Sequence, residues 1–336
     1  MAYQTGTANN MNDLMTQLST FAQGLGWTQD VYVAEAGTTD GRLSLHKDNC
    51  YVHWGWNSSK TPSIGMYQSL GFTPGADQDK HPDNSGNGPT WPPSTGATWN
   101  SGFDQYRMIS EIGAGPYTSY FFFGDNATVD YIHVALEFAP FTYRHLGFGN
   151  LEKAWNWTGG EYAYGHTQAL SDPNTQPSLL TSNGHPTSFA KRHPTMHVEG
   201  LPGQPANSKW GTFAAHSSLG SGWSDSNNNV QVRLVGSAPG STIGSVFNNL
   251  PSNAGDGFLP LVPVAVFYID VTPAPDLAYF LGWQPDVRTL NGRNFNPKDE
   301  ITVAGDTWQV FPHVRKQNTG DRNESRNYFI AYKKIV

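Results

Sequence analysis

Hydrophobic positions near the N-terminus recur at the spacing of an amphipathic helix. The stripe consists of Met11, Leu14, Met15, Leu18, Phe21, Ala22 and Leu25. Steps of three and four residues place these side chains on one helix face, with Asn9 or Asn10 as the expected cap and Gly24 or Gly26 as the expected stop. The apolar face must be covered by this chain's own core or by a neighbouring subunit. Because a polar leader precedes the helix and two glycines follow it, we expect the neighbouring subunit.

After the helix the pattern changes to short strands. Residues 31–35 predict one strand, and residues 42–46 and 50–56 predict a hairpin. The clearest signal lies in 119–149, where three apolar runs are joined by the short segments "GDN" and "APF". These runs are residues 121–123, 129–138 and 142–148. Asn and Gly supply the positive φ angles of tight hairpin turns, so this part predicts a three-stranded meander.

The C-terminal third also alternates between apolar runs and turn residues. Residues 230–236 and the apolar run 258–271 predict strands. Residues 300–312 predict a hairpin around "AGD", and residues 326–336 predict a last strand. No internal repeat of fixed period is found.

Two long stretches, 73–102 and much of 167–229, are rich in Gly, Pro, Ser and Asn and predict loops. The predicted fold is therefore mainly β, with a short N-terminal helix and leader (1–30) followed by an extended antiparallel β core (31–336) that carries long Gly/Pro-rich insertions. We expect contact with another chain to order the loops.

The amino-acid composition excludes some classes of binding partner. Charged residues are only 14% of the 336 positions, and the net charge is −7, with no basic cluster beyond "KR" and "YKK". Nucleic-acid binding needs a basic stripe and is not predicted. The N-terminus lacks the charged and apolar regions of a secretory signal, and the run 258–271 is too short to span a bilayer. We expect a protein made in the cytoplasm that stays soluble and binds no membrane.

Candidate catalytic and metal-binding groups are sparse. The sequence "HPTMHVE" contains His193, His197 and Glu199, but a proline follows the first histidine where zinc proteases carry Glu. The single cysteine, Cys50, is expected to be a buried small hydrophobic residue. Nucleophile-elbow, phosphate-loop and dinucleotide motifs are absent. We therefore predict no catalytic, cofactor-binding or metal-binding residue.

Carboxylates in the aromatic part of the chain leave two alternatives open. Asp130, Glu137, Glu152 and Glu161 lie in or beside this region, and paired carboxylates with stacking aromatics can hydrolyse a sugar. Glu137 lies in the middle of a predicted strand with no identifiable partner, and Glu152 is expected to form a solvated pair with Lys153. Sugar binding without catalysis is the stronger alternative, with a host surface glycan as the ligand.

The stretch 144–165, "RHLGFGNLEKAWNWTGGEYAYG", concentrates aromatic rings and glycines. Trp and Tyr suit both cores and interfaces because they offer large rigid areas and a polar tip. About half of these rings are expected inside and the others at a subunit contact. With the helix stripe, the candidate subunit-contact residues are Met11, Leu14, Leu18, Phe21, Phe148, Trp155, Trp157, Tyr162 and Tyr164.

Three segments resemble, in this order, parts of virion structural proteins of tailed bacteriophages. They are "MAYQTGTANNMNDLMTQLSTFAQGLGWT", the meander "YFFFGDNATVDYIHVALEFAPFTYRHLGFG", and "DEITVAGDTWQVFP" with "RNYFIAYK". The resemblance covers both ends and the middle of the chain and leaves out the long loops. It implies a non-enzymatic virion component of the tail or baseplate and supplies no catalytic residue.

Repeated copies in such a particle usually form closed rings, so a trimer or hexamer in contact with other virion proteins is expected. A receptor- or glycan-binding tail protein, a head decoration or head–tail joining protein, and a glycan-cleaving enzyme remain the alternatives.

Overall fold

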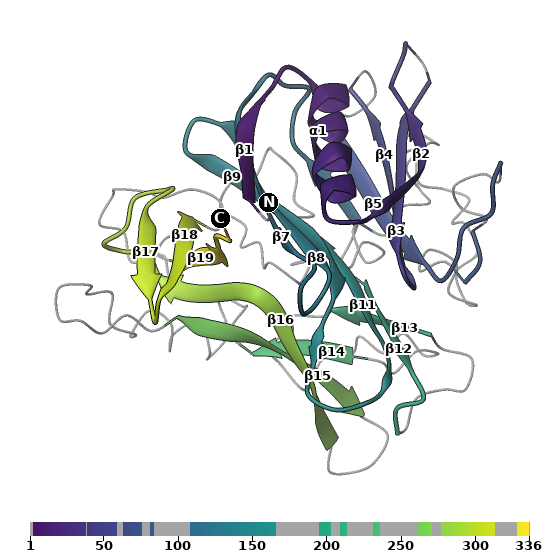
Figure 1. Cartoon of the computed structure of the whole chain (residues 1–336), viewed down its shortest axis with the longest axis vertical. Helices are drawn as coiled ribbons and strands as arrows, with labels where there is room; N and C mark the ends of the chain where they lie inside the picture. Colours follow the sequence, from purple (N-terminus) through teal and green to yellow (C-terminus); the bar gives the residue numbers. More distant parts are fainter. Residues whose placement is uncertain are drawn as a thin grey trace, which may run out of the picture.

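The computed structural model describes residues 3–37, 39–58, 63–75, 81–83, 108–165, 195–202, 209–213, 231–235, 261–270, 277–312 and 328–335. Over these residues the chain is mainly β with antiparallel sheets and one short N-terminal helix (Figure 1), which confirms the predicted fold class. The predicted loop 73–102 lies mostly outside the described residues. The predicted loop 167–229 does too, except where two short strands replace it.

The helix α1 runs from Met11 to Gly24 and begins where the sequence predicts. Asn10 is its cap, and its side-chain oxygen accepts a hydrogen bond of 2.9 Å from the backbone N–H of Asp13. Leu25 closes the helix, and Gly26 follows with a φ of 83°, a left-handed conformation that glycine adopts without strain.

Five strands form a small sheet beside the helix, in the order β2-β3-β4-β5-β6. They are Thr28–Val33 (β2), Gly41–Lys47 (β3), Cys50–Asn57 (β4), Ser63–Ser69 (β5) and Met108–Glu111 (β6). β3 and β4 pair antiparallel from Gly41↔Trp56 to Lys47↔Cys50, which confirms the predicted hairpin.

The other strands form one long sheet of fourteen strands, in the order β1-β7-β8-β9-β11-β12-β13-β14-β15-β16-β19-β18-β17 with β10 paired to β16. Its N-terminal half contains Tyr3–Ala8 (β1), Tyr117–Asp125 (β7), Tyr131–Ala139 (β8), Thr142–Asn150 (β9), Glu152–Lys153 (β10), Thr158–Gly165 (β11) and Thr195–Glu199 (β12). Its C-terminal half contains Trp210–Phe213 (β13), Gln231–Val235 (β14), Val262–Asp270 (β15), Leu277–Asn291 (β16), Glu300–Val303 (β17), Asp306–Pro312 (β18) and Tyr328–Lys333 (β19). The predicted meander is confirmed as β7-β8-β9, and the predicted closing hairpin as β17-β18.

The meander is the central layer of the molecule, and its two faces are buried in two different cores. Successive side chains of a strand point to opposite faces. Phe122 therefore packs in the core shared with α1 and the five-stranded sheet, whereas Phe121 and Phe123 pack in the core shared with the C-terminal strands. In Figure 1, β7 and β8 run diagonally between α1 with β2–β5 on one side and β14–β19 on the other. The sequence of a strand that is buried on both faces is a nearly continuous run of apolar residues, and the sequence of β8 has this form.

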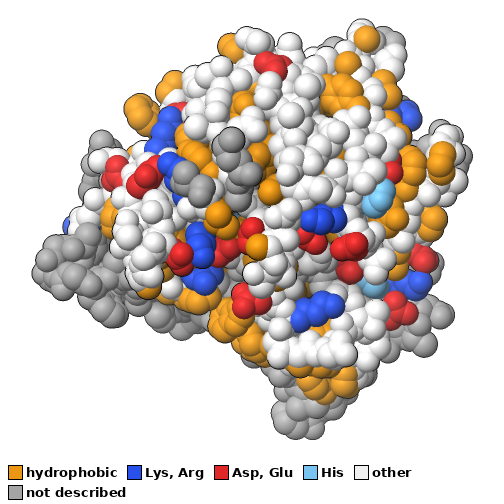
Figure 2. Space-filling view, viewed as in Figure 1, with side chains coloured by type: hydrophobic (Ala, Val, Ile, Leu, Met, Phe, Trp, Pro, Cys, Tyr) orange, Lys and Arg blue, Asp and Glu red, His pale blue; other side chains and the backbone are white. Residues whose placement is uncertain are grey.

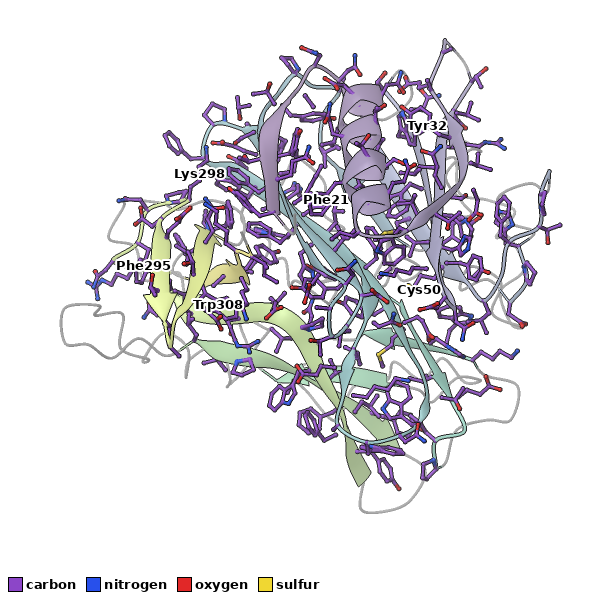
Figure 3. All side chains as sticks on the ribbon, viewed as in Figure 1. Phe21, Tyr32, Cys50, Phe295, Lys298 and Trp308 are labelled. Carbon is purple, nitrogen blue, oxygen red and sulfur yellow. The ribbon has the colours of Figure 1, made fainter. Side chains whose placement is uncertain are left out.

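The polar leader before the helix is an ordered edge strand. β1 pairs with β7 from Tyr3↔Phe123 to Ala8↔Tyr117. The helix stripe packs on this chain's own strands, and Phe21 lies between α1 and the central strands (Figure 3). The prediction that the stripe packs on a neighbouring subunit is therefore corrected, because β1, the meander and the five-stranded sheet already cover it.

Candidate functional site

Nearly all the predicted subunit-contact residues are inside this chain. Met11, Leu14, Leu18, Phe21 and Phe148 belong to the core around α1. Trp157, Tyr162 and Tyr164 belong to the core between the meander and the C-terminal strands. The tyrosines are buried because β11 lies inside the long sheet, between β9 and β12. Of the nine predicted residues, Trp155 alone is exposed, at 42% of its surface.

Trp155 follows β10, which pairs with β16, and we call the two exposed indoles of these segments, Trp155 and Trp283, the indole platform. Trp283 is the second exposed ring, at 37%. The indole N–H of Trp155 donates a 2.7 Å hydrogen bond to the carbonyl of Phe280, whose ring lies 4.9 Å from that of Trp283. The hydrogen bond to the backbone fixes the orientation of the Trp155 indole.

The β10–β16 pairing that builds the platform depends on Gly282. Its φ is +151°, and a Cβ there would lie 2.2 Å from the carbonyl oxygen of Glu152. Only glycine lets the two backbones approach this closely. Figure 2 shows hydrophobic side chains gathered at the lower end of the molecule, where Figure 1 draws β15 and β16.

The turn between β8 and β9 carries a third exposed aromatic ring. Phe141 is 62% exposed and adopts a φ of 58°, a left-handed conformation that is unfavourable for a bulky residue. Its backbone N–H donates a 2.9 Å hydrogen bond to Oε1 of Glu137. The buried Glu137 carboxylate also accepts from Ser119 Oγ at 2.6 Å and pairs with Lys298 Nζ at 2.6 Å.

Opposing effects set the pKa of Glu137. Burial acts to raise the pKa of this carboxyl, but hydrogen bonds from Lys298, Ser119 and the Phe141 amide outweigh burial and lower it. The carboxylate therefore stays charged at neutral pH and serves as the acceptor that holds the turn. Lys298 lies where the C-terminal strands meet the central strands (Figure 3). A proton donor for catalysis would need the opposite shift.

His133 and His145 are buried links between the meander and the C-terminal strands. His133 Nε2 lies 2.9 Å from the carbonyl of Pro285, and Nδ1 lies 2.9 Å from the Tyr164 hydroxyl. His145 repeats this arrangement with the carbonyl of Pro312 at 3.1 Å and the Tyr332 hydroxyl at 2.9 Å. Each carbonyl can only accept, so Nε2 carries the proton and Nδ1 accepts from the tyrosine.

Burial lowers the pKa of both histidines to about 3, although each backbone acceptor partly offsets it. They are therefore neutral at physiological pH. Both ring nitrogens of each histidine are used in cross-links, and the rings lie away from solvent. This geometry fits a structural role.

His53 links three strands of the small sheet. Its Nδ1 lies 2.9 Å from Ser44 Oγ and its Nε2 lies 2.7 Å from Ser69 Oγ. Ser69 donates its own proton to the carbonyl of Gly71 at 2.6 Å, so the histidine donates to Ser69 and does not activate it. Burial holds the pKa of His53 well below its usual value. This Ser–His–Ser cluster is a cross-link.

The histidine-containing segment 193–199 lies only partly within the residues that the structure describes. His193 lies outside the described residues, while His197 and Glu199 stand on β12. His197 Nδ1 lies 2.8 Å from Glu161 on β11, and Nε2 lies 3.3 Å from Glu199. No group of three His, Cys, Asp or Glu side chains in the described part of the chain is arranged to hold a metal ion.

The four candidate carboxylates have separate environments. Asp130 pairs with Lys47 at 2.6 Å, Glu137 holds the turn, and Glu161 contacts His197. Glu152 is exposed on β10 beside the platform.

Cys50 is buried, as expected, and burial raises the pKa of its thiol well above the usual value.

The sequence matches no protein-family model and no curated protein. In the part of the chain that is described, no helix has the length and apolar character needed to cross a membrane.

Proposed function

We propose that this chain is a non-enzymatic structural component of a tailed-phage virion, in the tail or baseplate, that acts through repeated subunit contacts. Closed rings of identical subunits, a trimer or a hexamer, are the arrangement that such contacts favour. Other virion proteins complete its set of partners.

The observation that carries this proposal is the convergence of the three segments that bear the resemblance. Tyr3, from the N-terminal segment, packs its ring 5.3 Å from that of Phe123 in the meander. Its hydroxyl donates a 3.1 Å hydrogen bond to Gln309 in the closing hairpin, 306 positions away. Lys334 places its ammonium 4.5 Å above the same ring. The three segments that bear the resemblance are therefore in contact with one another and form one structural unit.

The use of titratable groups also supports a structural role. Glu137 organises a turn, while His53, His133 and His145 each use both ring nitrogens in buried cross-links. These side chains stabilise packing between strands, and none of the histidines is placed to reach a substrate in solvent.

The test is to purify particles made from the genome that encodes this chain and to identify their proteins by mass spectrometry. We expect the chain in washed particles, and gold-labelled antibody should mark the tail or baseplate. Labelling of the head would favour the decoration or head–tail joining alternative. Abundant chain in lysed cells together with none in particles would contradict a virion role.

A receptor- or glycan-binding tail protein is the second candidate. Exposed indoles stack on the apolar faces of sugar rings, and Trp155 and Trp283 are both exposed, with Glu152 paired opposite Trp283 between β10 and β16. Binding of the purified chain to host polysaccharide, lost in Trp155→Ala, would favour this candidate.

A further inference from the structure

Among the strands that the structure describes, none pairs with a short part of one edge of β16. β10 pairs with this edge up to Trp283, and β19 pairs with it from Val287 onward. Gln284, Pro285 and Asp286 lie between these two pairings. Side chains of other strands must therefore hold this part of β16 in place.

Two of these three residues are held by direct hydrogen bonds from β8. His133 donates from Nε2 to the carbonyl of Pro285 over 2.9 Å. Tyr131 donates from its hydroxyl to Oδ2 of Asp286 over 2.6 Å. The amide of Gln284 is the third polar group in this row.

The Gln284 amide is fully buried, and neither its oxygen nor its nitrogen has a hydrogen-bond partner in the described part of the chain. The hydroxyl of Tyr162, on β11, is also fully buried and lacks a partner there. The amide offers two N–H donors and one oxygen acceptor, and the hydroxyl offers a donor and an acceptor. Because unpaired polar groups are unfavourable in a protein interior, nearly all of them in native proteins have a partner.

The two groups lie near each other without a direct hydrogen bond. Tyr162 and Tyr164 pack in the core that also contains Leu281 and Val287, which lie on either side of Gln284 along β16. Burial raises the pKa of the Tyr162 hydroxyl well above its usual value, and the nearby Gln284 amide offsets part of this rise. The same amide acts on the hydroxyl of Tyr164, whose pKa burial also raises. The amide and the two hydroxyls are therefore within reach of one small bridging molecule.

We propose that an ordered water molecule binds between the Gln284 amide and the Tyr162 hydroxyl and links β16 to β11. Water both donates and accepts hydrogen bonds, and a buried water needs two to four polar partners. It can accept from the amide N–H or the Tyr162 hydroxyl and donate to the oxygen of Tyr164, whose own proton goes to Nδ1 of His133.

The donor and acceptor pattern distinguishes water from an ion. A halide ion accepts hydrogen bonds only, so it would leave the Gln284 oxygen without a donor. The carboxylate of Asp286 is close enough to act on Tyr162 and would repel an anion. A metal cation would bind oxygen atoms and leave the amide N–H groups unpaired.

The water molecule would complete the row of polar links to β16. Direct hydrogen bonds hold Pro285 and Asp286, and the water would hold Gln284. A shift of β16 by one residue would leave these buried polar atoms unpaired, so the row favours a single alignment of β16 against β8 and β11. This site is independent of the proposed function, because it concerns the interior of one chain.

A crystal structure of the full chain, at a resolution that shows ordered waters, tests the site directly. We expect a density peak within hydrogen-bond distance of the Gln284 amide and the Tyr162 hydroxyl. A direct hydrogen bond between these two side chains, or the lack of a peak, would overturn the inference. An anomalous peak at this position after a bromide soak would assign the site to a halide and overturn it as well.

Magnetic relaxation dispersion of the water signal tests the site in solution, because it detects waters that stay bound for longer than the protein takes to tumble. The double variant Tyr162→Phe with Gln284→Met removes both polar groups at similar volume. Its dispersion amplitude should be lower than that of wild type by the contribution of one long-lived water. An unchanged amplitude in the folded double variant would contradict the proposal.

Gln309→Met is the matched control. Gln309 is also buried, but both ends of its amide have protein partners: the oxygen accepts from the Tyr3 hydroxyl at 3.1 Å and the nitrogen donates to the Lys298 carbonyl at 3.4 Å. This variant should keep the wild-type amplitude. A loss equal to that of the double variant would show that the signal does not come from the Gln284 site.

Discussion

The carboxylate of Glu137 is buried and lies 2.6 Å from the ammonium of Lys298, while its other oxygen accepts the amide N–H of Phe141. One side chain thereby joins the meander to the segment that precedes the closing hairpin and also fixes the exposed turn. Removing a charge from such a pair leaves the partner uncompensated, which costs more than the pair itself contributes.

Glu137→Gln should therefore destabilise the chain. We expect a loss of about 1–3 kcal/mol in the free energy of unfolding, below the usual cost for a fully buried pair because Lys298 is partly exposed. Urea denaturation of the purified chain measures it. Glu152→Gln is the matched control, since this carboxylate is exposed on β10, and it should leave stability within about 0.5 kcal/mol of wild type. Equal stability of the two variants would show that the contact between Glu137 and Lys298 does not stabilise the folded chain.

The buried histidines predict loss of stability in acid. His133 and His145 have pKa values near 3 in the folded chain, against an ordinary value of about 6.5 in the unfolded chain. The unfolded chain therefore binds more protons between these values, so stability is complete above pH 6.5 and falls as the pH drops toward 3. Each histidine contributes a slope of about 1.4 kcal/mol per pH unit in this window.

Urea denaturation at pH 7.5, 6.0, 5.0 and 4.5 measures this slope. His145→Gln should remain folded at neutral pH and show a shallower slope. Thr20→Ala, at an exposed position of α1, removes no titratable group and is the control that should keep the wild-type slope. Stability that stays constant from pH 7.5 to 4.5 would exclude neutral buried histidines. Glu137, whose pKa is lowered, adds to the loss only below its ordinary range.

Local patterns predicted local structure well. The spacing of Leu14 and Leu18 predicted the helix, and short turn segments predicted the β3–β4 hairpin and the meander. The strand β16 was missed because Gly282 and Pro285 interrupt its pattern, although Gly282 is needed for the close approach of β10, and the Pro285 carbonyl accepts a hydrogen bond from His133. Tertiary contacts decide such elements, so periodicity does not reveal them.

The candidate sites depend on pairings between distant segments. Phe141 could be recognised as a turn residue, but its exposure and strain follow from a carboxylate held by Lys298 of another segment. Trp155 was predicted as a contact residue, whereas Trp283 was not. The hydrogen bond from Trp155 to the Phe280 carbonyl depends on the pairing of β10 with β16, and no sequence signal marks a two-residue strand.

The helix stripe makes a prediction about the isolated chain. Leu14 is 3% exposed within the chain's own core, so Leu14→Ala removes packed methyl groups and leaves a cavity. We expect a loss of about 2–5 kcal/mol in the free energy of unfolding of the monomer. Thr20→Ala, at an exposed position on the opposite side of the helix, should change stability little. An unchanged melting temperature for Leu14→Ala would place the stripe at a boundary between subunits after all.

Gly282 gives the sharpest test of how the platform is built. An alanine there would place its Cβ 2.2 Å from the carbonyl oxygen of Glu152, at a φ of +151° that L residues rarely adopt. Backbone atoms cannot yield as a flexible side chain does, so Gly282→Ala should break the β10–β16 pairing and release Trp155 from the Phe280 carbonyl. We expect a loss of more than about 1 kcal/mol in the free energy of unfolding, with a red shift of tryptophan fluorescence as the indole becomes more exposed.

Gly24→Ala is the matched control, because nothing lies within 4 Å of a Cβ at the end of α1. It should be neutral or stabilising by about 0.5–1 kcal/mol, since alanine favours the helical state more than glycine does. If Gly282→Ala folds with wild-type stability and fluorescence, the close approach of β10 to β16 does not hold the platform.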